Sequence, residues 1–453
     1  MSTEIQTNKM LDDTIVAQAT ANGLASISIL RLSGKSALAL AKKITKKQNF
    51  TPRFAHLCSL HDNKGDFFDE GLVIYFKAPF SFTGEDIVEF QCHGGYILSE
   101  FLLKQLLTLG ARLAKAGEFS KRAFLNNKMD LSKAEAIASM IESRSEDGLR
   151  ILAKTLRGDL KNFVDKARND LLNVLAFSEV SIDYAEEDLP KDIEKDIMVK
   201  LKSLQKKLKN ILELSKRREG LIEGFKVAII GKPNVGKSSL LNKMLNNDRA
   251  IVSEIAGTTR DSIEENIKIG THLIKIVDTA GIRKTNDFIE KKGVEKSIGI
   301  SSEADIILAI FDNSKKITEE DKNILKLLED SKKDKIFILN KCDLEANFDS
   351  SILKNPINLS AKEDVSKLFK KLEDLLNNKN DSEGLSLNSQ RQINAVKACL
   401  KAINEAFEPL EDMELELFSF HINEALEEIS SITKAYKNEQ MLDVMFSSFC
   451  LGK

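Results

Sequence analysis

The chain has 453 residues, of which 42% are hydrophobic and 30% charged, so it can form about three domains with buried cores and is not disordered overall. Lys and Arg total 67 against 69 for Asp and Glu, a net charge of -2, so any RNA contact requires a local patch or a partner. The sequence shows no secretory signal, no apolar run near the ~20 residues that span a membrane, and five scattered cysteines, which predicts a cytoplasmic protein without disulfides or structural zinc.

Residues 1–125 mix short β-rich runs with helical stretches and glycine-bearing turns, which predicts a compact α+β domain. Strands are expected at Ser26–Leu32, Gly71–Phe76 and Asp86–Gln91, and a helix at Tyr96–Leu109.

Residues 126–222 are almost wholly helical in pattern, and Ser132-Lys-Ala-Glu135 has the form of a capping box that opens a helix. A second helix carries an apolar stripe with 3,4 spacing, typical of a helix packed in a bundle. The stripe consists of Leu201, Leu204, Leu208 and Ile211.

Residues 223–378 alternate β-branched runs with helical segments, which predicts a doubly wound parallel sheet. Residues 379–453 return to a helical pattern, with Ile422, Leu426 and Ile429 on one stripe. We expect the helices before and after the α/β unit to form one bundle into which this unit is inserted. The alternative is two separate helical domains.

The strongest motif begins where the predicted strand Phe225–Ile230 ends. Gly231-Lys-Pro-Asn-Val-Gly-Lys-Ser238 follows this strand and precedes a helical segment, which is the context of a phosphate-binding P-loop. We expect Lys237 to reach the β- and γ-phosphates and Ser238 to ligate Mg²⁺. The expected loop contacts are Asn234, Val235, Gly236, Lys237, Ser238 and Ser239.

Three further elements stand in the order of a GTPase. Asp278-Thr279-Ala280-Gly281 ends the predicted strand His272–Val277, with the aspartate near Mg²⁺ and the Gly281 N–H at the γ-phosphate. Asn340-Lys341-Cys-Asp343 ends the strand Lys335–Leu339. A carboxylate at that point accepts two hydrogen bonds from guanine, which adenine does not offer, so the motif predicts GTP rather than ATP. Backbone N–H groups of Ser360, Ala361 and Lys362 are expected at the guanine O6, and Thr259 is the candidate switch threonine on Mg²⁺.

The catalytic water lacks its usual partner. Many GTPases place a glutamine directly after the Asp-x-x-Gly element, and this chain has Ile282, which forms no hydrogen bond. Glu290 is a candidate to position the water, and a solvated helix residue is the other reading of the same side chain.

Beyond these elements, several motifs resemble the MnmE (TrmE) tRNA-modification GTPase family over the whole chain. They are Asn234 in the P-loop, Gly257-Thr-Thr-Arg-Asp261, Ile282, Asp13–Thr20, Ile29–Gly34, Ser81–Asp86, Gly117–Ser120, Arg122–Asn126 and the ending Phe449-Cys-Leu-Gly-Lys453. The one departure noted is Ala21-Asn22, where prolines are common in the family.

The resemblance implies a homodimer that acts on tRNA with a flavin-dependent partner, MnmG (GidA). Together they would install an aminomethyl or carboxymethylaminomethyl group at C5 of the wobble uridine. The carbon would come from a reduced folate, 5-formyl- or methylene-tetrahydrofolate, bound by the N-terminal dimerisation domain. The residues that match the family's folate site are Arg31, Glu89, Lys128 and Lys453.

The same resemblance implies that potassium stimulates catalysis. Asn234 and the segment 253–258 would hold K⁺, a role that other GTPases give to an arginine finger, and Glu290 would position the water. The implied residues of this segment are Ser253, Ile255, Ala256, Gly257 and Thr258. A C-terminal segment docked on the folate domain is preferred over a nucleophilic Cys450.

Two other classes of GTPase remain as alternatives. An Era-like ribosome-assembly switch would carry an RNA-binding module after the G domain, often with a Gly-x-x-Gly loop, which residues 379–453 lack. A membrane-remodelling GTPase would need a lipid-binding basic amphipathic face, and none stands out.

Overall fold

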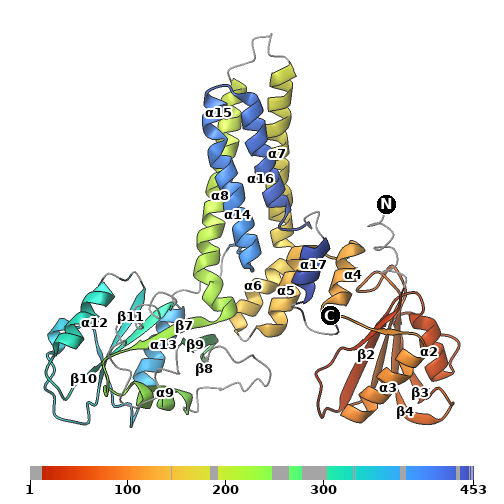
Figure 1. Cartoon of the computed structure of the whole chain (residues 1–453), viewed down its shortest axis with the longest axis horizontal. Helices are drawn as coiled ribbons and strands as arrows, with labels where there is room; N and C mark the ends of the chain where they lie inside the picture. The colour runs from red at the N-terminus through yellow and green to blue at the C-terminus, as the bar shows by residue number, and fades with distance from the viewer. Residues whose placement is uncertain are drawn as a thin grey trace. The chain divides into compact units, whose positions relative to one another are not determined.

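The computed structural model describes a chain that divides into two compact units (Figure 1). One unit is drawn from Met1–Ala138, Lys161–Glu179 and Ser419–Lys453, and the other from Ser139–Leu160 and Val180–Phe418. The described residues are 13–143, 145–183, 192–246, 265–277, 304–329, 331, 333–377, 384–434, 439–447, 449 and 452. Among these residues, no helix is both long and apolar enough to span a bilayer.

The first unit contains a six-stranded sheet with the order β3-β4-β5-β2-β1-β6. Neighbouring strands are antiparallel except for β1 and β6, which are parallel. The strands are β1 Ile15–Gln18, β2 Ile27–Ser33, β3 Ala55–His61, β4 Phe67–Phe76, β5 Ile87–His93 and β6 Arg112–Leu113. Three of them confirm the strands predicted from sequence.

Helices α2 (Ala37–Thr45) and α3 (Tyr96–Thr108) bury their apolar faces against this sheet (Figure 1). Their buried leucines and isoleucine lie in one core with Leu30, Leu32 and Phe90 of the strands. The predicted helix at Tyr96–Leu109 is confirmed, and the α+β character of this unit follows from this two-layer packing.

The helices that follow join the C-terminal segment. Helix α4 spans Glu118–Leu125, α5 spans Leu131–Glu142 and α17 spans Glu439–Ser447. Side chains from all three meet in a small apolar cluster. The predicted capping box is wrong, because α5 begins at Leu131 and the Asp130 carboxylate accepts the Lys133 N–H at 3.1 Å. Ser132 lies within the first turn and bonds to Asp130.

The first unit also takes in most of α7 (Asp159–Asp183) and of α16 (Leu415–Ser430). Ser178 of α7 and Ser419 of α16 share a hydrogen bond of 2.8 Å, and Ile422 and Ile429 of the predicted stripe are buried. The region predicted as one helical domain is therefore divided between the two units.

The second unit contains a six-stranded sheet with the order β12-β11-β10-β7-β9-β8. All neighbouring strands are parallel except β8 and β9. The strands are β7 Phe225–Ile230, β8 Glu265–Ile269, β9 His272–Val277, β10 Ile306–Asp312, β11 Asp334–Asn340 and β12 Ile357–Asn358. The strands predicted at 225–230 and 272–277 match residue for residue, and the predicted strand at 335–339 lies within β11.

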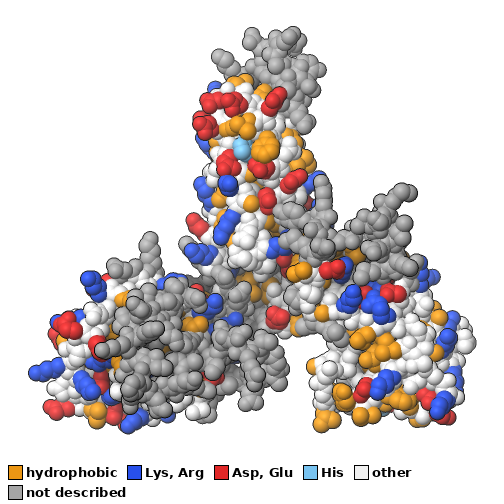
Figure 2. Space-filling view, in the orientation of Figure 1, with side chains coloured by type: hydrophobic (Ala, Val, Ile, Leu, Met, Phe, Trp, Pro, Cys, Tyr) orange, Lys and Arg blue, Asp and Glu red, His pale blue; other side chains and the backbone are white. Residues whose placement is uncertain are grey.

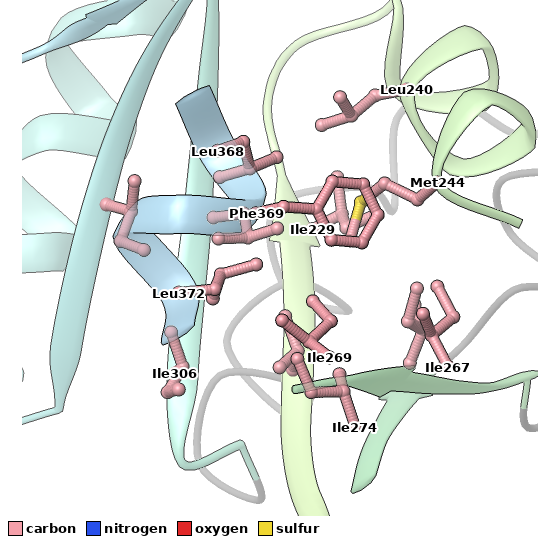
Figure 3. Close-up of a cluster of buried hydrophobic side chains, with 14 of the residues drawn as sticks. Ile229, Leu240, Met244, Ile267, Ile269, Ile274, Ile306, Leu368, Phe369 and Leu372 are labelled. Atoms are coloured by element: carbon pink, nitrogen blue, oxygen red, sulfur yellow. The ribbon is translucent and has the colours of Figure 1, made fainter. Parts of the chain in front are cut away.

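Helices cover both faces of this sheet, as the doubly wound prediction requires. Helices α9 (Lys237–Leu245) and α13 (Ser366–Asn377) share one core with Ile229 and Ile306, and Figure 3 shows Leu368, Phe369 and Leu372 facing these strands. Helix α12 (Glu319–Glu329) contributes to the core on the other face. Every residue of β10 is buried, as expected for a central parallel strand.

Helices from before and after the α/β region pack together in this unit. Helix α8 (Asp192–Glu223) contacts α6 (Glu146–Arg157) and α14 (Gln390–Glu405), and α14 leads into α15 (Phe407–Glu411). The predicted stripe of α8 is buried along its whole length. Because α8 precedes and α14 follows the sheet in the chain, this packing agrees with an inserted α/β domain. Only Gly224 separates α8 from β7.

Candidate functional site

The P-loop lies at the carboxyl end of β7, between β10 and β9. In the sheet, β9 lies on one side of β7 and β10 lies on the other, so the strand order reverses at β7. Open α/β sheets bind ligands at the carboxyl ends of the strands where the order reverses in this way. Gly236 is the N-cap of helix α9 and has a φ of 102°, and a Cβ at this position would lie 2.2 Å from the Asn340 Nδ2 atom. Glycine is therefore required both by the backbone conformation and by the approach of Asn340.

Asn340, the last residue of β11, joins two loops of the site. Its Nδ2 donates to the Val235 carbonyl at 2.7 Å, and its Oδ1 accepts the Ala361 N–H at 2.9 Å. The side chain is buried, so both of its polar ends depend on these partners. The side-chain amide of Asn340 thus holds the P-loop and the segment 360–362 together. The sequence motifs predicted the order of these segments along the chain, but not this contact.

Lys341 makes a second connection to the P-loop. Its Nζ donates to the Asn234 carbonyl at 2.8 Å and forms an ion pair with Asp312, at the end of β10, at 2.6 Å. Burial alone would raise the pKa of Asp312, but hydrogen bonds from Lys341 and Ser314 outweigh it and lower that pKa below 3.8. Asp312 is therefore ionised at neutral pH and holds Lys341 beside the loop.

The P-loop lysine lies across its own loop. The Lys237 Nζ donates to the Gly231 carbonyl at 2.6 Å and to the Lys232 carbonyl at 2.8 Å. The loop backbone thus positions the ammonium group within the curve where phosphates are expected. Ser238 and Ser239 follow in the first turn of α9, where the positive end of the helix dipole favours an anion.

One ion pair of the P-loop was missed by the sequence analysis. Lys232 Nζ donates to Asp321 Oδ2 of α12 at 2.6 Å, and both side chains are largely buried. The same oxygen accepts the N–H and hydroxyl of Thr318. Lys232 stands inside the predicted motif, but its partner is 89 residues away, and no sequence signal joins the two.

The carboxylate predicted to select guanine is accessible. Asp343 is exposed. In the segment 360–362, Lys362 is also exposed, whereas Ser360 and Ala361 are buried. This arrangement suits a base that enters from solvent and meets the Asp343 carboxylate at the surface. The remaining predicted nucleotide and potassium residues lie outside the described part of the chain. They are Ser253, Ile255, Ala256, Gly257, Thr258, Thr259, Asp278, Thr279, Ala280, Gly281 and Glu290.

In the first unit, the structure brings Arg31 and Glu89 together. They are partners in the register of β2 and β5, and the Arg31 Nε and Nη2 atoms each lie 2.7 Å from Glu89 Oε1. The guanidinium group lies 5.8 Å from the ring centre of Phe82 and 5.9 Å from that of Phe119. The sequence analysis named Arg31 and Glu89 as site residues, but it did not predict that they form an ion pair or that the pair lies beside two aromatic rings.

Lys128 lines a pocket of about 570 Å³ that also reaches Phe82. Arg53 supplies a second cation to its wall, and the aromatic Phe76 and Phe80 supply much of the apolar surface. Phe82 therefore connects the Arg31–Glu89 pair with the pocket. An apolar wall with two cations fits an aromatic ligand that carries an anionic tail. Arg53 carried no sequence signal, whereas Phe82 stands within the motif 81–86.

Other residues of the N-terminal motifs form a buried charge network. Arg122, which is only 3% exposed, contacts Glu85 at 3.2 Å, Glu118 at 3.2 Å and Asp13. Arg112 binds Glu118 at 2.6 Å and Asp13 at 2.7 Å. These residues join β1, the 81–86 loop and α4, so this part of the motif set serves the fold rather than an open site.

The C-terminal segment docks on the same unit. Phe449 packs against Phe446, and a Cβ at Gly452 would lie 2.6 Å from the Gln18 carbonyl of β1. The preferred reading of this segment as a docked one agrees with these two positions. Cys450 and Lys453 lie outside the described residues.

The doubly wound sheet, the P-loop at its switch point and the amide of Asn340 that joins the loops define a P-loop GTPase domain. The protein-family model described as "MnmE helical domain" matches residues 131–450, and the one described as "GTP-binding protein TrmE N-terminus" matches residues 14–128. The chain belongs to the MnmE family, and it is a GTPase.

Curated relatives agree over nearly the full length. A protein of Aliarcobacter butzleri named tRNA modification GTPase MnmE is 60% identical over 98% of this chain and 99% of its own length. A protein of Sulfurimonas denitrificans with the same name is 58% identical over 98% and 100%. Among solved structures, Era in complex with MgGDPNP and a segment of 16S ribosomal RNA is 28% identical with a TM-score of 0.27. That match covers 39% of this chain and 66% of Era.

Proposed function

We propose that this protein is the GTP-hydrolysing component of a complex that modifies C5 of the wobble uridine of tRNA. The group installed would be aminomethyl or carboxymethylaminomethyl. The observation that carries the proposal is the 60% identity, across 98% of the chain, to a protein named tRNA modification GTPase MnmE. The GTPase part of the proposal is supported by the hydrogen bonds that join Asn340 to the P-loop and to Ala361.

The chain's own residues divide the work on GTP. The P-loop backbone and Lys237 hold the phosphates, Asp343 selects guanine, and Ser238 with Thr259 would hold Mg²⁺, which neutralises charge on the phosphates when bound. Asn234 is exposed with a φ of 62°, so its side chain is available for a potassium ion together with segment 253–258. Glu290 is proposed to position the attacking water, because Ile282 cannot.

Potassium dependence tests this part directly. We expect GTP turnover to be markedly faster in KCl than in NaCl at equal ionic strength, because K⁺ would stabilise the charge that develops between the phosphates. Multiple-turnover rates measured over a range of protein concentrations give the comparison. Equal rates in the two salts at every concentration would remove potassium from the proposal.

The N-terminal unit is proposed to bind a reduced folate, the donor of the one-carbon unit. The pair Arg31–Glu89 offers charged hydrogen-bonding groups to a pterin edge, and Lys128 with Arg53 suits the anionic tail. When bound, the folate supplies the carbon, and these residues orient it. The unit is also proposed to form a homodimer.

A flavin-dependent partner of the MnmG (GidA) type is proposed to supply the redox chemistry in the cytoplasm. An Era-like function is less supported, because the N-terminal and helical family models together match residues 14–128 and 131–450.

Mass spectrometry of the wobble uridine in tRNA tests the function as a whole. Cells without this protein are expected to lack the C5 group, and the wild-type gene should restore it. A matched gene carrying Asp343→Asn should restore it poorly, because the amide keeps one acceptor oxygen but places an NH₂ donor against a guanine N–H. The purified variant should bind GTP more weakly and xanthosine triphosphate more tightly. Unchanged wobble modification in the deletion strain would refute the proposed function.

A further inference from the structure

Helix α8 presents a row of five lysines on one face. At about 100° per residue, they fall within a sector of about 80° around the helix axis. All five are exposed. Figure 2 shows Lys and Arg side chains along this helical part, with Asp and Glu side chains also present, several of them toward its top. The residues of this lysine face are Lys195, Lys202, Lys206, Lys209 and Lys216.

The opposite face of α8 is the packed one. Leu201, Leu204 and Leu208 are buried and lie about 100–160° from the middle of the lysine face around the helix axis. Gln205 lies at one edge of the lysine face and donates to Asn404 of α14 at 2.6 Å. The lysine face is therefore turned away from the buried leucines of α8, and α14 reaches only one edge of it. Among its described residues, α8 exposes one large apolar side chain, Val199. A single valine is too little apolar surface for insertion into a bilayer, which argues against a membrane as the partner.

The charge on this face is not neutralised locally. Between Lys195 and Lys216 the chain has seven lysines and two acidic residues, Asp196 and Glu213. None of the five lysines of the face forms an ion pair with a described residue. Lys202, Lys206 and Lys209 are spaced i,i+4 and i,i+3, so they repel one another along the helix. Such repulsion reduces the stability of the helix, so these lysines do not stabilise α8 through their charges.

Other exposed helices of the same unit are mixed in charge. Helix α13 carries Lys367, Lys370 and Lys371 but also Glu373 and Asp374, and the whole chain has a net charge of -2. The lysine face of α8 is thus a local basic patch in a chain that is otherwise balanced. A local patch of this kind is what a protein with this net charge needs to hold a polyanion.

We propose that the lysine face of α8 binds the phosphate backbone of RNA. The inference rests on the proposed function, for which the RNA is tRNA, and it adds where on this chain that RNA is held. From Lys195 to Lys216 the face is about 32 Å long, so several phosphates can be contacted at once. Lysines contact phosphates as point charges without reading sequence, so this face contributes affinity rather than choice of tRNA.

The test replaces Lys202, Lys206 and Lys209 together by glutamine in the full-length protein. Glutamine keeps the helix propensity of lysine and removes the charge. Binding to a fluorescein-labelled tRNA transcript is measured by anisotropy at several salt concentrations, with and without the flavin-dependent partner. We expect at least about tenfold weaker binding near 0.1 M salt. The slope of log K against log salt should fall by about 2 to 3, since each lost phosphate contact contributes about 0.7–0.9.

The matched control replaces Lys367, Lys370 and Lys371 of α13, which are also exposed, by glutamine. This control should keep both the affinity and the salt slope of the wild type, and both variants should keep the GTP turnover that reports an intact G domain. An equal loss of tRNA binding in the two triple variants would show a non-specific charge effect and overturn the inference.

Two further outcomes contradict the inference. The inference is overturned if the α8 variant binds tRNA as tightly as the wild type. If that variant binds tRNA normally but no longer binds the flavin-dependent partner, the lysine face binds a protein instead. The proposed function fails separately, through unchanged wobble uridine in cells that lack this protein. A deletion strain without the modification, together with normal tRNA binding by the α8 variant, would therefore refute the α8 inference alone.

Discussion

The P-loop region and the N-terminal charge network both contain motif residues, but they use them differently. Around the P-loop, Asn340 and Lys341 donate to backbone carbonyls of Val235 and Asn234, so side chains fix the shape of a loop that stays open to solvent. In the N-terminal unit, Arg122 is enclosed by Asp13, Glu85 and Glu118. A motif therefore does not by itself distinguish a binding site from an internal support, and burial of the charged group decides between them.

The largest effect is expected from replacing the buried Arg122, which tests whether the charge network supports the fold. Arg122→Met should reduce the free energy of unfolding of the N-terminal unit by about 3–5 kcal/mol, because three carboxylates lose a buried partner. Urea denaturation measures the change, and GTP affinity should stay at the wild-type value. Lys104→Gln, which removes an exposed pair with Glu100, is the control and should leave the urea midpoint unchanged. Normal stability of the Arg122 variant would show that the network does not support the fold.

The next effect is expected at the P-loop. Asn340→Ala removes two buried hydrogen bonds, to the Val235 carbonyl and from the Ala361 N–H, and should cost about 2 kcal/mol, or about 30-fold in nucleotide affinity. Titration with a fluorescent GDP analogue measures this affinity. Asn347→Ala, at an exposed position with long hydrogen bonds, should bind nucleotide like the wild type. If both variants bind alike, Asn340 does not hold the loops together.

Glu290 separates nucleotide binding from chemistry. Glu290→Ala should leave GTP affinity nearly intact and reduce turnover at least tenfold, about 1.4 kcal/mol of transition-state stabilisation, because its carboxylate is proposed to meet water rather than nucleotide. Steady-state phosphate release gives the rate, and Asp287→Ala is the matched carboxylate control. Wild-type turnover in the Glu290 variant would make it a solvated residue, and weak GTP binding would place it elsewhere in the site.

The smallest expected effect concerns pH. Burial alone would raise the pKa of Glu118, but hydrogen bonds from Arg112 and the Lys115 N–H outweigh it and lower that pKa below 4.5. A lowered folded-state pKa gives stability that is present above pH 4.5 and lost as the pH falls through the folded value. The urea midpoint of the N-terminal unit should therefore fall on acidification below 4.5. Arg112→Gln should flatten this dependence, and an identical profile in that variant would remove the pair from the explanation.

The sequence by itself determined the parts of this protein whose signals are contiguous. The P-loop, the strand Phe225–Ile230 and the helix of Lys237 follow from neighbouring residues, because strand, turn and helix each depend on local backbone geometry. The apolar stripe of α8 likewise follows from helical spacing. The capping box was wrong because Asp130, one residue before the helix, accepts the Lys133 N–H and the Ser132 hydroxyl, so the helix begins before Ser132.

Only the tertiary structure decided which distant charges meet. Arg31 and Glu89 are 58 residues apart, and their contact depends on the register of β2 and β5, which no periodic pattern encodes. Lys232 and Asp321 meet because α12 packs against the sheet beside the P-loop. The lysine face of α8 was present in the sequence, but its exposure follows from the burial of the leucines on the opposite face in the packing of α8 with α6 and α14. Long-range ion pairs and exposed faces depend on packing, and packing is a property of the whole fold.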